Sequence, residues 1–221
     1  MPAADPLPRP RAAIALPLLA AGCAVFALLA ADLLLHGPVT AADAGISRWF
    51  HAHAGAAVTG FLQLVSDVHS TRAILLMAAL ALIALLWRRQ FAWAPALVLC
   101  VPGGMLLNTA VKDGFQRARP ALEGVTSTLG SYSFPSGHTA GATVWWGFAL
   151  VWVFAHCPLA RERATAAAVA VLLVLLTALS RVVLGAHYLS DVLAAMAEGA
   201  AWLGLCFALL AHAPWERARR R

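Results

Sequence analysis

Residues 12–35 read AAIALPLLAAGCAVFALLAADLLL, and Asp32 is the only charged side chain in this run. An α-helix needs about 20 apolar residues to cross the hydrocarbon core of a bilayer. The run shows no alternation of apolar and polar residues, so a helix is favoured over a barrel strand. It is also too long for a cleaved signal peptide. This stretch therefore predicts a transmembrane helix.

Five more apolar segments of similar length follow, at residues 71–87, 91–111, 139–156, 164–180 and 188–211. Of the 221 residues, 62% are hydrophobic and 12% are charged, whereas a soluble domain carries about 25% charged residues. We therefore expect an all-α polytopic membrane protein, a six-transmembrane-helix bundle that forms a single domain over residues 1–221. Within it, residues 1–11 predict a disordered N-terminus, and residues 215–221 predict a basic cytoplasmic tail.

The basic residues are distributed unequally between the two sides of this predicted bundle. One side carries ten arginines, and the other carries six basic residues. The positive-inside rule places the side with ten arginines, and with it both termini, in the cytoplasm. The Ala- and Arg-rich composition suggests a bacterial cytoplasmic membrane. A nucleic-acid partner would require one basic face with interleaved aromatic residues, and the sequence does not predict such a face.

The first outer connection, residues 41–70, mixes apolar and polar residues and predicts one helix lying in the membrane interface. His51 and His53 are two positions apart and do not share a helix face, so solvated histidines are expected there and no metal site. The cysteines show neither metal-ligand spacing nor a disulfide framework, which favours packing roles. They are Cys23, Cys100, Cys157 and Cys206.

Three polar stretches fall in the other outer connections. They are KDGFQRARP at 112–120, PSGH at 135–138 and SRVVLGAHYLSD at 180–191. Odd-numbered connections of a six-span bundle share one face. The sequence therefore predicts that the three stretches meet at the outer surface of the membrane.

Cations and backbone amides in these stretches predict an anion site. Lys112, Arg119 and Arg181 bring three positive charges, and Lys112 is the only lysine in the chain. Arginine forks match phosphate oxygens, and a lysine ammonium acts as a point charge. Ser136 can cap the helix that follows it, and Gly137 allows a close backbone approach to an anion. The expected anion is phosphate.

The same stretches carry two histidines and a carboxylate. His187 and Asp191 are four residues apart, which places them on one helical face. The carboxylate can fix the imidazole tautomer and stabilise its charged form, while His138 can donate a proton to a leaving group. Taken alone, the His187–Asp191 pair also fits a buried structural histidine. Arg181 at its fixed spacing and the other two stretches favour a catalytic site.

Together, the three stretches resemble the motifs of the type 2 phosphatidic acid phosphatase family, which shares its site with vanadium haloperoxidases. The resemblance covers about 80 residues, from Lys112 to Asp191, and all three motifs are present without departure. It implies that His187, oriented by Asp191, attacks phosphorus and forms a phosphohistidine. His138 would then protonate the leaving alkoxide and later activate water. The residues expected to hold the phosphoryl oxygens are Lys112, Arg119, Ser136, Gly137 and Arg181.

The function expected from this resemblance is hydrolysis of a membrane lipid phosphate or diphosphate at the outer face, with no metal or other cofactor. Undecaprenyl diphosphate, phosphatidate and phosphatidylglycerophosphate are candidate substrates. Two alternatives stay open, a lipid-linked phosphotransferase and a non-enzymatic transporter of anionic lipids. The sequence does not reveal the oligomeric state.

Two further charged residues allow more than one interpretation. Glu198 lies within an apolar segment, where carboxylates are functional candidates. It is expected either to hydrogen-bond Asn108 or Ser180, or to line a substrate path. Arg117 is expected to extend to the membrane surface or to contact a lipid headgroup.

Overall fold

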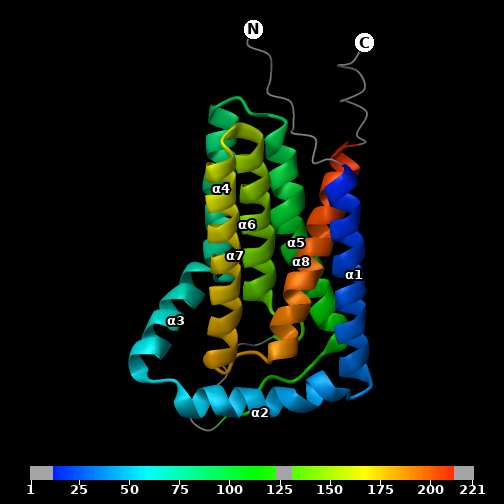
Figure 1. Ribbon diagram of the computed structural model, residues 1–221, viewed down its shortest axis with the longest axis vertical. Helices are drawn as coiled ribbons and strands as arrows, with labels where there is room; N and C mark the ends of the chain where they lie inside the picture. Colours follow the sequence, from blue (N-terminus) through cyan, green and yellow to red (C-terminus); the bar gives the residue numbers. More distant parts are fainter. Residues whose placement is uncertain (1–11, 123–130, 212–221) are drawn as a thin grey trace.

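The computed structural model describes residues 12–122 and 131–211, so the expected disordered N-terminus and basic tail lie outside the described residues. The described chain folds into helices joined by short connections (Figure 1). Each of the six expected apolar segments forms one helix, which confirms an all-α polytopic fold. The helices are α1 (Ala12–Leu34), α2 (Pro38–His53), α3 (Ala56–Val68), α4 (Thr71–Trp87), α5 (Trp93–Phe115), α6 (Gly137–His156), α7 (Ala160–Val183) and α8 (Leu189–Ala211).

Fewer of the described helices are long and apolar enough to cross a membrane than the six expected segments. Within the described residues, four helices are long and apolar enough to cross a membrane, namely α1, α5, α7 and α8. A fifth crossing results if α3 and α4, bent by 46° at a short break, cross as one. Helix α6 begins with the polar and small residues GHTAGAT, which lower its hydropathy. Six crossings therefore stay a prediction, while the membrane-protein class is confirmed.

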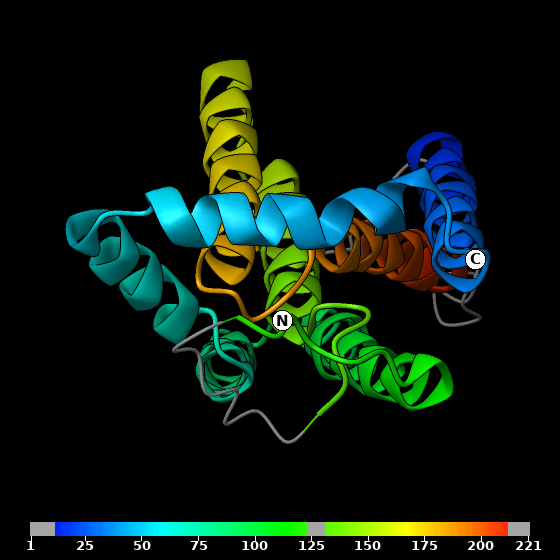
Figure 2. The same cartoon turned by 90° about the horizontal axis from the view of Figure 1, so that it is seen from below.

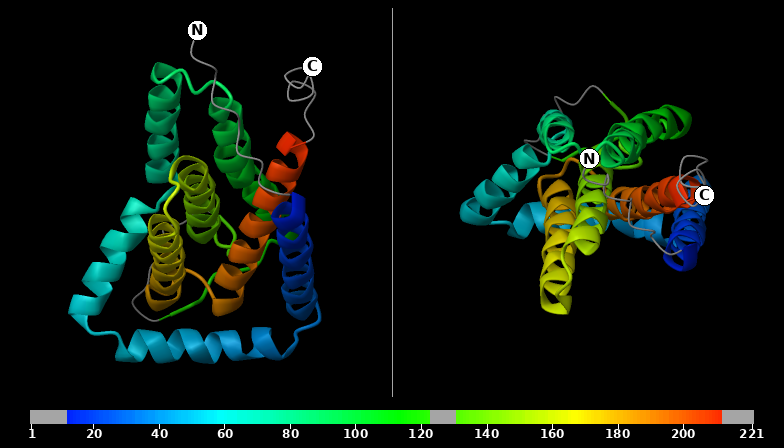
Figure 3. Two further views of the ribbon diagram at one scale, coloured as in Figure 1. Left: turned by 45° about the horizontal axis from the view of Figure 1, so that its top comes forward. Right: turned by 90° about the horizontal axis from the view of Figure 1, so that it is seen from above.

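The first outer connection differs from the single interfacial helix that was expected. Two helices form there, because the backbone at Ala54 and Gly55 is extended and ends α2 before α3 begins. Helix α2 runs across one end of the bundle, as the view from below shows (Figure 2). It carries the chain from the side of α1 to the side of α3 (Figure 3). Helix α3 then packs against α7.

Helices α1 and α8 pack along each other through small residues. A Cβ atom added at Gly204 would lie 2.6 Å from the backbone nitrogen of Leu19 and 2.7 Å from the carbonyl oxygen of Ala15. A Cβ atom at Gly22 would meet α8 equally closely, at 2.6 Å from the nitrogen of Ala201. In a membrane, such close backbone approach replaces the hydrophobic effect as the source of helix association.

A glycine-to-alanine pair of variants tests this packing. Gly204→Ala is expected to lower the free energy of unfolding by about 1–3 kcal/mol, because α1 must move away from α8. Gly45→Ala serves as the matched control, since a Cβ atom there meets nothing within 4 Å and alanine favours the helix. Unfolding midpoints measured in detergent micelles report both effects. Equal midpoints for the two variants would contradict the close α1–α8 contact.

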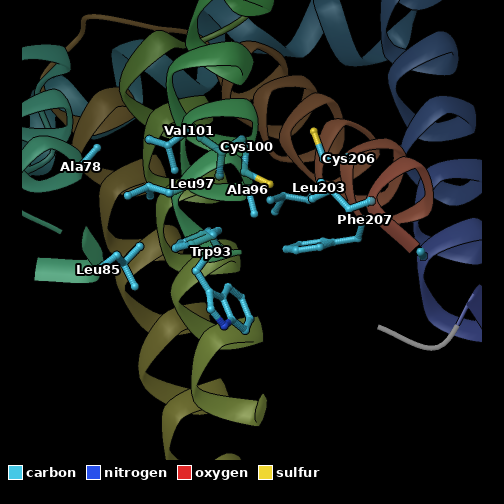
Figure 4. Close-up of a cluster of buried hydrophobic side chains, with 14 of the residues drawn as sticks. Ala78, Leu85, Trp93, Ala96, Leu97, Cys100, Val101, Leu203, Cys206 and Phe207 are labelled. Carbon is cyan, nitrogen blue, oxygen red and sulfur yellow. The ribbon is translucent and has the colours of Figure 1, made fainter. Parts of the chain in front are cut away.

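The main apolar core lies in the half of the bundle away from α2 (Figure 4). Trp93 at the start of α5 is fully buried and meets Phe148 of α6 edge-on, with ring centroids 5.9 Å apart. Cys100 and Cys206 are buried in the same core, as expected of packing residues. The buried polar side chains of α5, α7 and α8 concentrate in the other half, next to α2.

Candidate active site

The three polar stretches meet at the end of the bundle that α2 crosses. The end of α5, the start of α6, the end of α7 and the start of α8 all lie there (Figure 2). A cavity of about 440 Å³ opens among them, with Lys112, Arg119, Gly137, His138 and His187 in its lining. The other expected site residues, Ser136, Arg181 and Asp191, are buried next to these elements.

A tight turn after α7 places His187 in the cavity wall. Gly185 has a φ of 66°, a left-handed conformation that glycine adopts without steric cost. The N–H groups of Ala186 and His187 then both donate to the carbonyl of Arg181, at 3.0 and 3.1 Å. This turn closes the C-terminus of α7. It thereby fixes the spacing between the arginine and the histidine of the third stretch.

The imidazole of His187 is held between a guanidinium and a carboxylate. Its Nε2 atom lies 3.1 Å from a terminal nitrogen of Arg119, and its Nδ1 atom lies 3.4 Å from Oδ2 of Asp191. Because an arginine can only donate, Nε2 is the acceptor and the ring proton is assigned to Nδ1. In this tautomer the lone pair of Nε2 accepts from Arg119 at the cavity wall, and the Nδ1 proton faces Asp191 and the hydroxyl of Ser133, whose oxygen lies 3.4 Å from Nδ1.

Asp191 is fixed by several donors besides the histidine. It occupies the third position of α8, and its Oδ2 accepts the backbone N–H of Tyr188 at 2.9 Å, as in a capping box. The hydroxyl of Ser133 donates to the same oxygen at 2.5 Å. A nitrogen of Arg117 donates to Oδ1 at 2.6 Å. The orientation of the carboxylate is therefore set by the first turn of α8 and by two neighbouring segments.

Burial controls the protonation of His187, which is 1% exposed. Burial lowers the pKa of His187 to about 4, although the hydrogen bond and the charge of Asp191 act to raise it. The positive charges of Lys112 and Arg119 lower it further. Protonation would occur only below about pH 4, so the imidazole is neutral at neutral pH, as a nucleophile would have to be.

A titration of histidine nitrogens tests this protonation state. In ¹⁵N-histidine-labelled protein, we expect the His187 resonances to stay those of a neutral ring with its proton on Nδ1 between pH 5 and 8. His187→Gln assigns the resonances by removing them. Conversion to the imidazolium pattern between pH 6 and 7 would contradict the burial effect.

The cations are anchored by the loop that precedes α6. Arg119 donates to the carbonyls of Ser131, at 2.9 Å, and Ala186, at 2.7 Å. The ammonium group of Lys112 donates to the carbonyl of Tyr132 at 2.9 Å. Neither cation is neutralised by a carboxylate at hydrogen-bond distance within the described residues. Both therefore present positive charge to the cavity, where no carboxylate pairs with them directly among the described residues, although Asp113 also lines the cavity.

Arg181 contributes a third cation from the end of α7. Its side chain is almost fully buried and donates to the hydroxyl of Ser66 in α3. The Nε atom of Arg181 has no hydrogen-bond partner among the residues that the structure describes. A buried donor without a partner is costly, so a ligand that accepts from it would be stabilised.

The start of α6 adds backbone donors, in a way that departs from the expected cap. Ser136 occupies the N-cap position, but its hydroxyl does not cap the helix and instead accepts from Thr139 at 3.1 Å. The first N–H groups of a helix lack intrahelical partners. A Cβ atom at Gly137 would come within 3.3 Å of Oδ1 of Asn108, which leaves little room for a larger residue. Gly137 and His138 therefore bring the helix N-terminus to the cavity wall.

The expectation for Arg117 was wrong. Its side chain is only 11% exposed and forms ion pairs with Asp43, at 2.7 Å, and Asp191, at 2.6 Å. Sequence reasoning also missed Ser133 and Asp43 as partners of the site. Ser133 lies two residues before the second motif, so its position was a usable signal. Asp43 lies 74 residues from Arg117, and nothing in the sequence linked the two.

Glu198 lies deeper in the bundle, and the expected hydrogen bond to Asn108 is confirmed. The side-chain nitrogen of Asn108 donates to Oε2 of Glu198 at 2.8 Å. Asn108 also lines the cavity, one helical turn from Lys112. Oε1 of Glu198 has no partner within the described part of the chain.

Comparisons with known proteins agree with this fold and these motifs. The described fold is similar to the crystal structure of the first transmembrane PAP2 type phosphatidylglycerolphosphate phosphatase from Bacillus subtilis. The TM-score is 0.75 at 24% identity, over 85% of this chain and 93% of that chain. A second similar structure is Aquifex aeolicus LpxE, with a TM-score of 0.56 at 23% identity, over 76% of this chain and 93% of that chain. At these identities the likeness shows the fold alone.

Sequence comparisons extend the likeness to the motifs. The chain is 32% identical to phosphatidylglycerophosphatase B of Bacillus subtilis (strain 168) over 109 residues, which is 48% of this chain. The match spans about half of that relative, at 53% of its length. Residues 91–215, which contain all three motifs, match the family model of the PAP2 superfamily. This match covers more than half of the chain, and we conclude that the chain belongs to the PAP2 superfamily.

Proposed function

We propose that the protein is a lipid phosphate phosphatase that hydrolyses the terminal phosphate of a membrane lipid through a phosphohistidine intermediate. The observation that carries the proposal is the contact between Nε2 of His187 and Arg119 in the wall of a cationic cavity. The guanidinium that stabilises a phosphoryl oxygen thus lies next to the nitrogen that attacks phosphorus. Family membership supports the same chemistry.

In the first step, Nε2 of His187 attacks phosphorus, and the bond from phosphorus to the lipid oxygen breaks. The Nδ1 proton stays on the ring, and Asp191 stabilises the positive charge that develops there. His138, which lines the same cavity, would take up a proton as the anionic phosphate binds beside it, and would donate that proton to the leaving lipid oxygen. The phosphoryl oxygens would be held by the cations and by the N-terminus of α6. These are Lys112, Arg119, Arg181, Ser136 and Gly137.

In the second step, water attacks the phosphohistidine. His138 accepts a proton from the water, and the bond between phosphorus and Nε2 breaks to release inorganic phosphate. The imidazole of His187 returns to its neutral form. Most of the rate enhancement comes from positioning and from the charge placed around the phosphoryl group. These steps require no metal ion.

The shape of the cavity supports a lipidic substrate. Beyond the cationic residues, its wall is formed by side chains of α4 and α5, including Leu75, Met105 and Leu106. Leu106 is 72% exposed, as expected of a residue that faces lipid. A phosphate held by the cations would therefore extend its apolar chain along α4 and α5. Phosphatidylglycerophosphate, phosphatidate and undecaprenyl diphosphate all have this form, and the first is the substrate for which the similar Bacillus subtilis phosphatase is named.

The proposed location is a bacterial cytoplasmic membrane with the cavity on the outer side. Arg88 and Arg89 in the connection between α4 and α5, and Arg161 and Arg163 in the first turn of α7, lie at the end of the bundle away from α2. The positive-inside rule assigns that end to the cytoplasm. Helix α2 and the cavity would then lie at the extracytoplasmic surface.

Release of phosphate from a panel of lipid phosphates tests the proposed function. Purified protein in mixed micelles is expected to release inorganic phosphate from phosphatidylglycerophosphate, phosphatidate or undecaprenyl diphosphate. Vanadate, which mimics the five-coordinate phosphorus of the transition state, should inhibit at millimolar concentration, and a chelator should leave the rate unchanged. No release from any substrate, with transport of the intact lipids in vesicles, would favour the transporter alternative instead. Phosphate transfer to an added alcohol would favour a phosphotransferase.

A further inference from the structure

Arg117 lies between two carboxylates that come from opposite ends of the chain. One terminal nitrogen donates to Oδ1 of Asp191 at 2.6 Å, and the other donates to Oδ2 of Asp43 at 2.7 Å. The guanidinium carbon also lies 4.2 Å from the centre of the Tyr188 ring. The fork of an arginine is rigid and planar, so the two ion pairs and the ring contact fix it in one orientation.

Asp43 connects this arginine to the start of α8. The carboxylate of Asp43 is 1% exposed and accepts the backbone N–H of Ser190 at 3.0 Å. The hydroxyl of Ser190 donates to the same carboxylate. It also accepts a hydrogen bond from Arg117 at 2.7 Å. Asp43 belongs to α2, the helix that crosses the end of the bundle (Figure 2). Helix α2 is thus bonded to the turn of α8 that carries Asp191.

The charge balance of the group matters for catalysis. Two carboxylates share one guanidinium, so the negative charge of Asp191 is only partly neutralised. Burial lowers the pKa of Arg117, but Asp191 and Asp43 together raise it above its ordinary value, so the arginine stays cationic. An Asp191 that keeps part of its negative charge can stabilise the positive imidazole that forms when His187 is phosphorylated.

We propose that Arg117 and Asp43 are positioning residues that set the orientation and effective charge of Asp191, so that helix α2 is part of the catalytic unit. Neither residue lines the cavity, and both act through Asp191. The inference rests on the proposed function for its kinetic consequences. Without Asp43, Arg117 is free to pair entirely with Asp191, which weakens the support that Asp191 gives to His187.

An isosteric pair of variants separates positioning from simple attachment of α2. Asp43→Asn removes the shared charge, whereas Asp32→Asn, the matched control, weakens a different anchor of the same helix. Asp32 accepts the backbone N–H groups of Val39 and Thr40 at 3.2 and 2.8 Å. It has no hydrogen bond or ion pair with Asp191 among the described contacts. Both variants loosen α2, but only Asp43→Asn removes a hydrogen-bonded partner of Arg117, because Asp32 interacts with that arginine through its charge alone.

The first measurement is steady-state kinetics, in which the effect of each variant on kcat is determined separately from its effect on KM. Asp43→Asn is expected to lower kcat about 10-fold, because Arg117 then neutralises Asp191 more fully. Arg117→Gln is expected to lower kcat about 100-fold, because the carboxylate loses a donor that fixes its orientation. KM should change less than threefold in both, because Asp191 acts on the transition state. Arg117→Lys should recover part of the loss, since an ammonium keeps the charge but cannot bridge both carboxylates. Asp32→Asn should keep kcat within twofold of the wild type. Equal kcat losses for Asp43→Asn and Asp32→Asn, or no loss for either, would overturn the inference.

An NMR measurement tests the positioning role without relying on phosphatase activity, so a failure of this inference can be told apart from a failure of the proposed function. The ¹⁵N and proton resonances of His187 Nδ1–H report its contact with Asp191 without any turnover. Asp43→Asn is expected to shift them, and Asp32→Asn is expected to leave them unchanged. If wild-type protein hydrolysed no lipid phosphate but the shift occurred, the proposed function would fail and the positioning role would stand. If Asp43→Asn did not accumulate in the membrane, Arg117→Lys would take its place, and unchanged resonances would contradict the role.

Discussion

Replacement of His187 by alanine is expected to lower phosphate release by about 10⁴-fold or more. The imidazole is the proposed nucleophile, and no other side chain places an unprotonated nitrogen next to Arg119 at 3.1 Å within the described residues. Substrate binding should be largely retained, because the cations and the N-terminus of α6 are unchanged. The measurement is the rate of inorganic phosphate release under saturating lipid phosphate, compared with the binding of vanadate.

His51→Ala is the matched control for this variant. His51 lies exposed on α2, away from the cavity lining, so its removal should leave the rate within about twofold of the wild type. A His187→Ala protein that retained more than a tenth of the activity would contradict a nucleophilic role. It would show that the contacts of this histidine with Arg119 and Asp191 are structural.

Arg119→Lys is expected to lower kcat/KM by about 100-fold, and Arg119→Gln by up to about 1000-fold. Arg119 contacts Nε2 of His187 while its other nitrogens hold the carbonyls of Ser131 and Tyr132. A lysine offers one compact ammonium and cannot make these bonds together. The substitution therefore removes both a proposed phosphoryl donor and the bonds that hold the loop before α6. Steady-state kinetics on one lipid phosphate measures the effect.

Arg72→Lys provides the control for this second variant. Arg72 lies exposed in the first turn of α4, at the same end of the bundle, and is outside the cavity lining. The same change there should alter kcat/KM by less than twofold, because a solvated charge is replaced by another. If Arg119→Lys were as active as Arg72→Lys, the bidentate role of the guanidinium would be wrong.

The sequence predicted the helices well because each is a long apolar segment in a chain whose solvent is lipid. The pattern is set locally, so the bounds of α1 and α4 agree with expectation almost to the residue. The break between α2 and α3 was not predicted. The break depends on the extended backbone at Ala54 and Gly55. The mixed apolar and polar composition of this stretch is compatible with either one helix or two.

The candidate site was predictable only in part, because some of its residues are marked by local sequence and others meet only through tertiary packing. Lys112, His138 and His187 could be grouped because they sit at the ends of apolar segments that the span count places on one face. The partners of Asp191 could not, because Asp43 and Arg117 meet through tertiary packing of α2 on α8. Arg117 near a membrane surface looks like a solvated arginine until its carboxylate partners are located in space.

Stereochemistry at phosphorus tests the phosphohistidine route most directly. A lipid thiophosphate made chiral with oxygen isotopes would be hydrolysed in water that carries the third isotope, and the configuration of the released thiophosphate would be determined. Attack by His187 followed by attack of water gives two in-line displacements, so the configuration is expected to be retained. Inversion would mean a single displacement by water, and His187 would then not be the nucleophile.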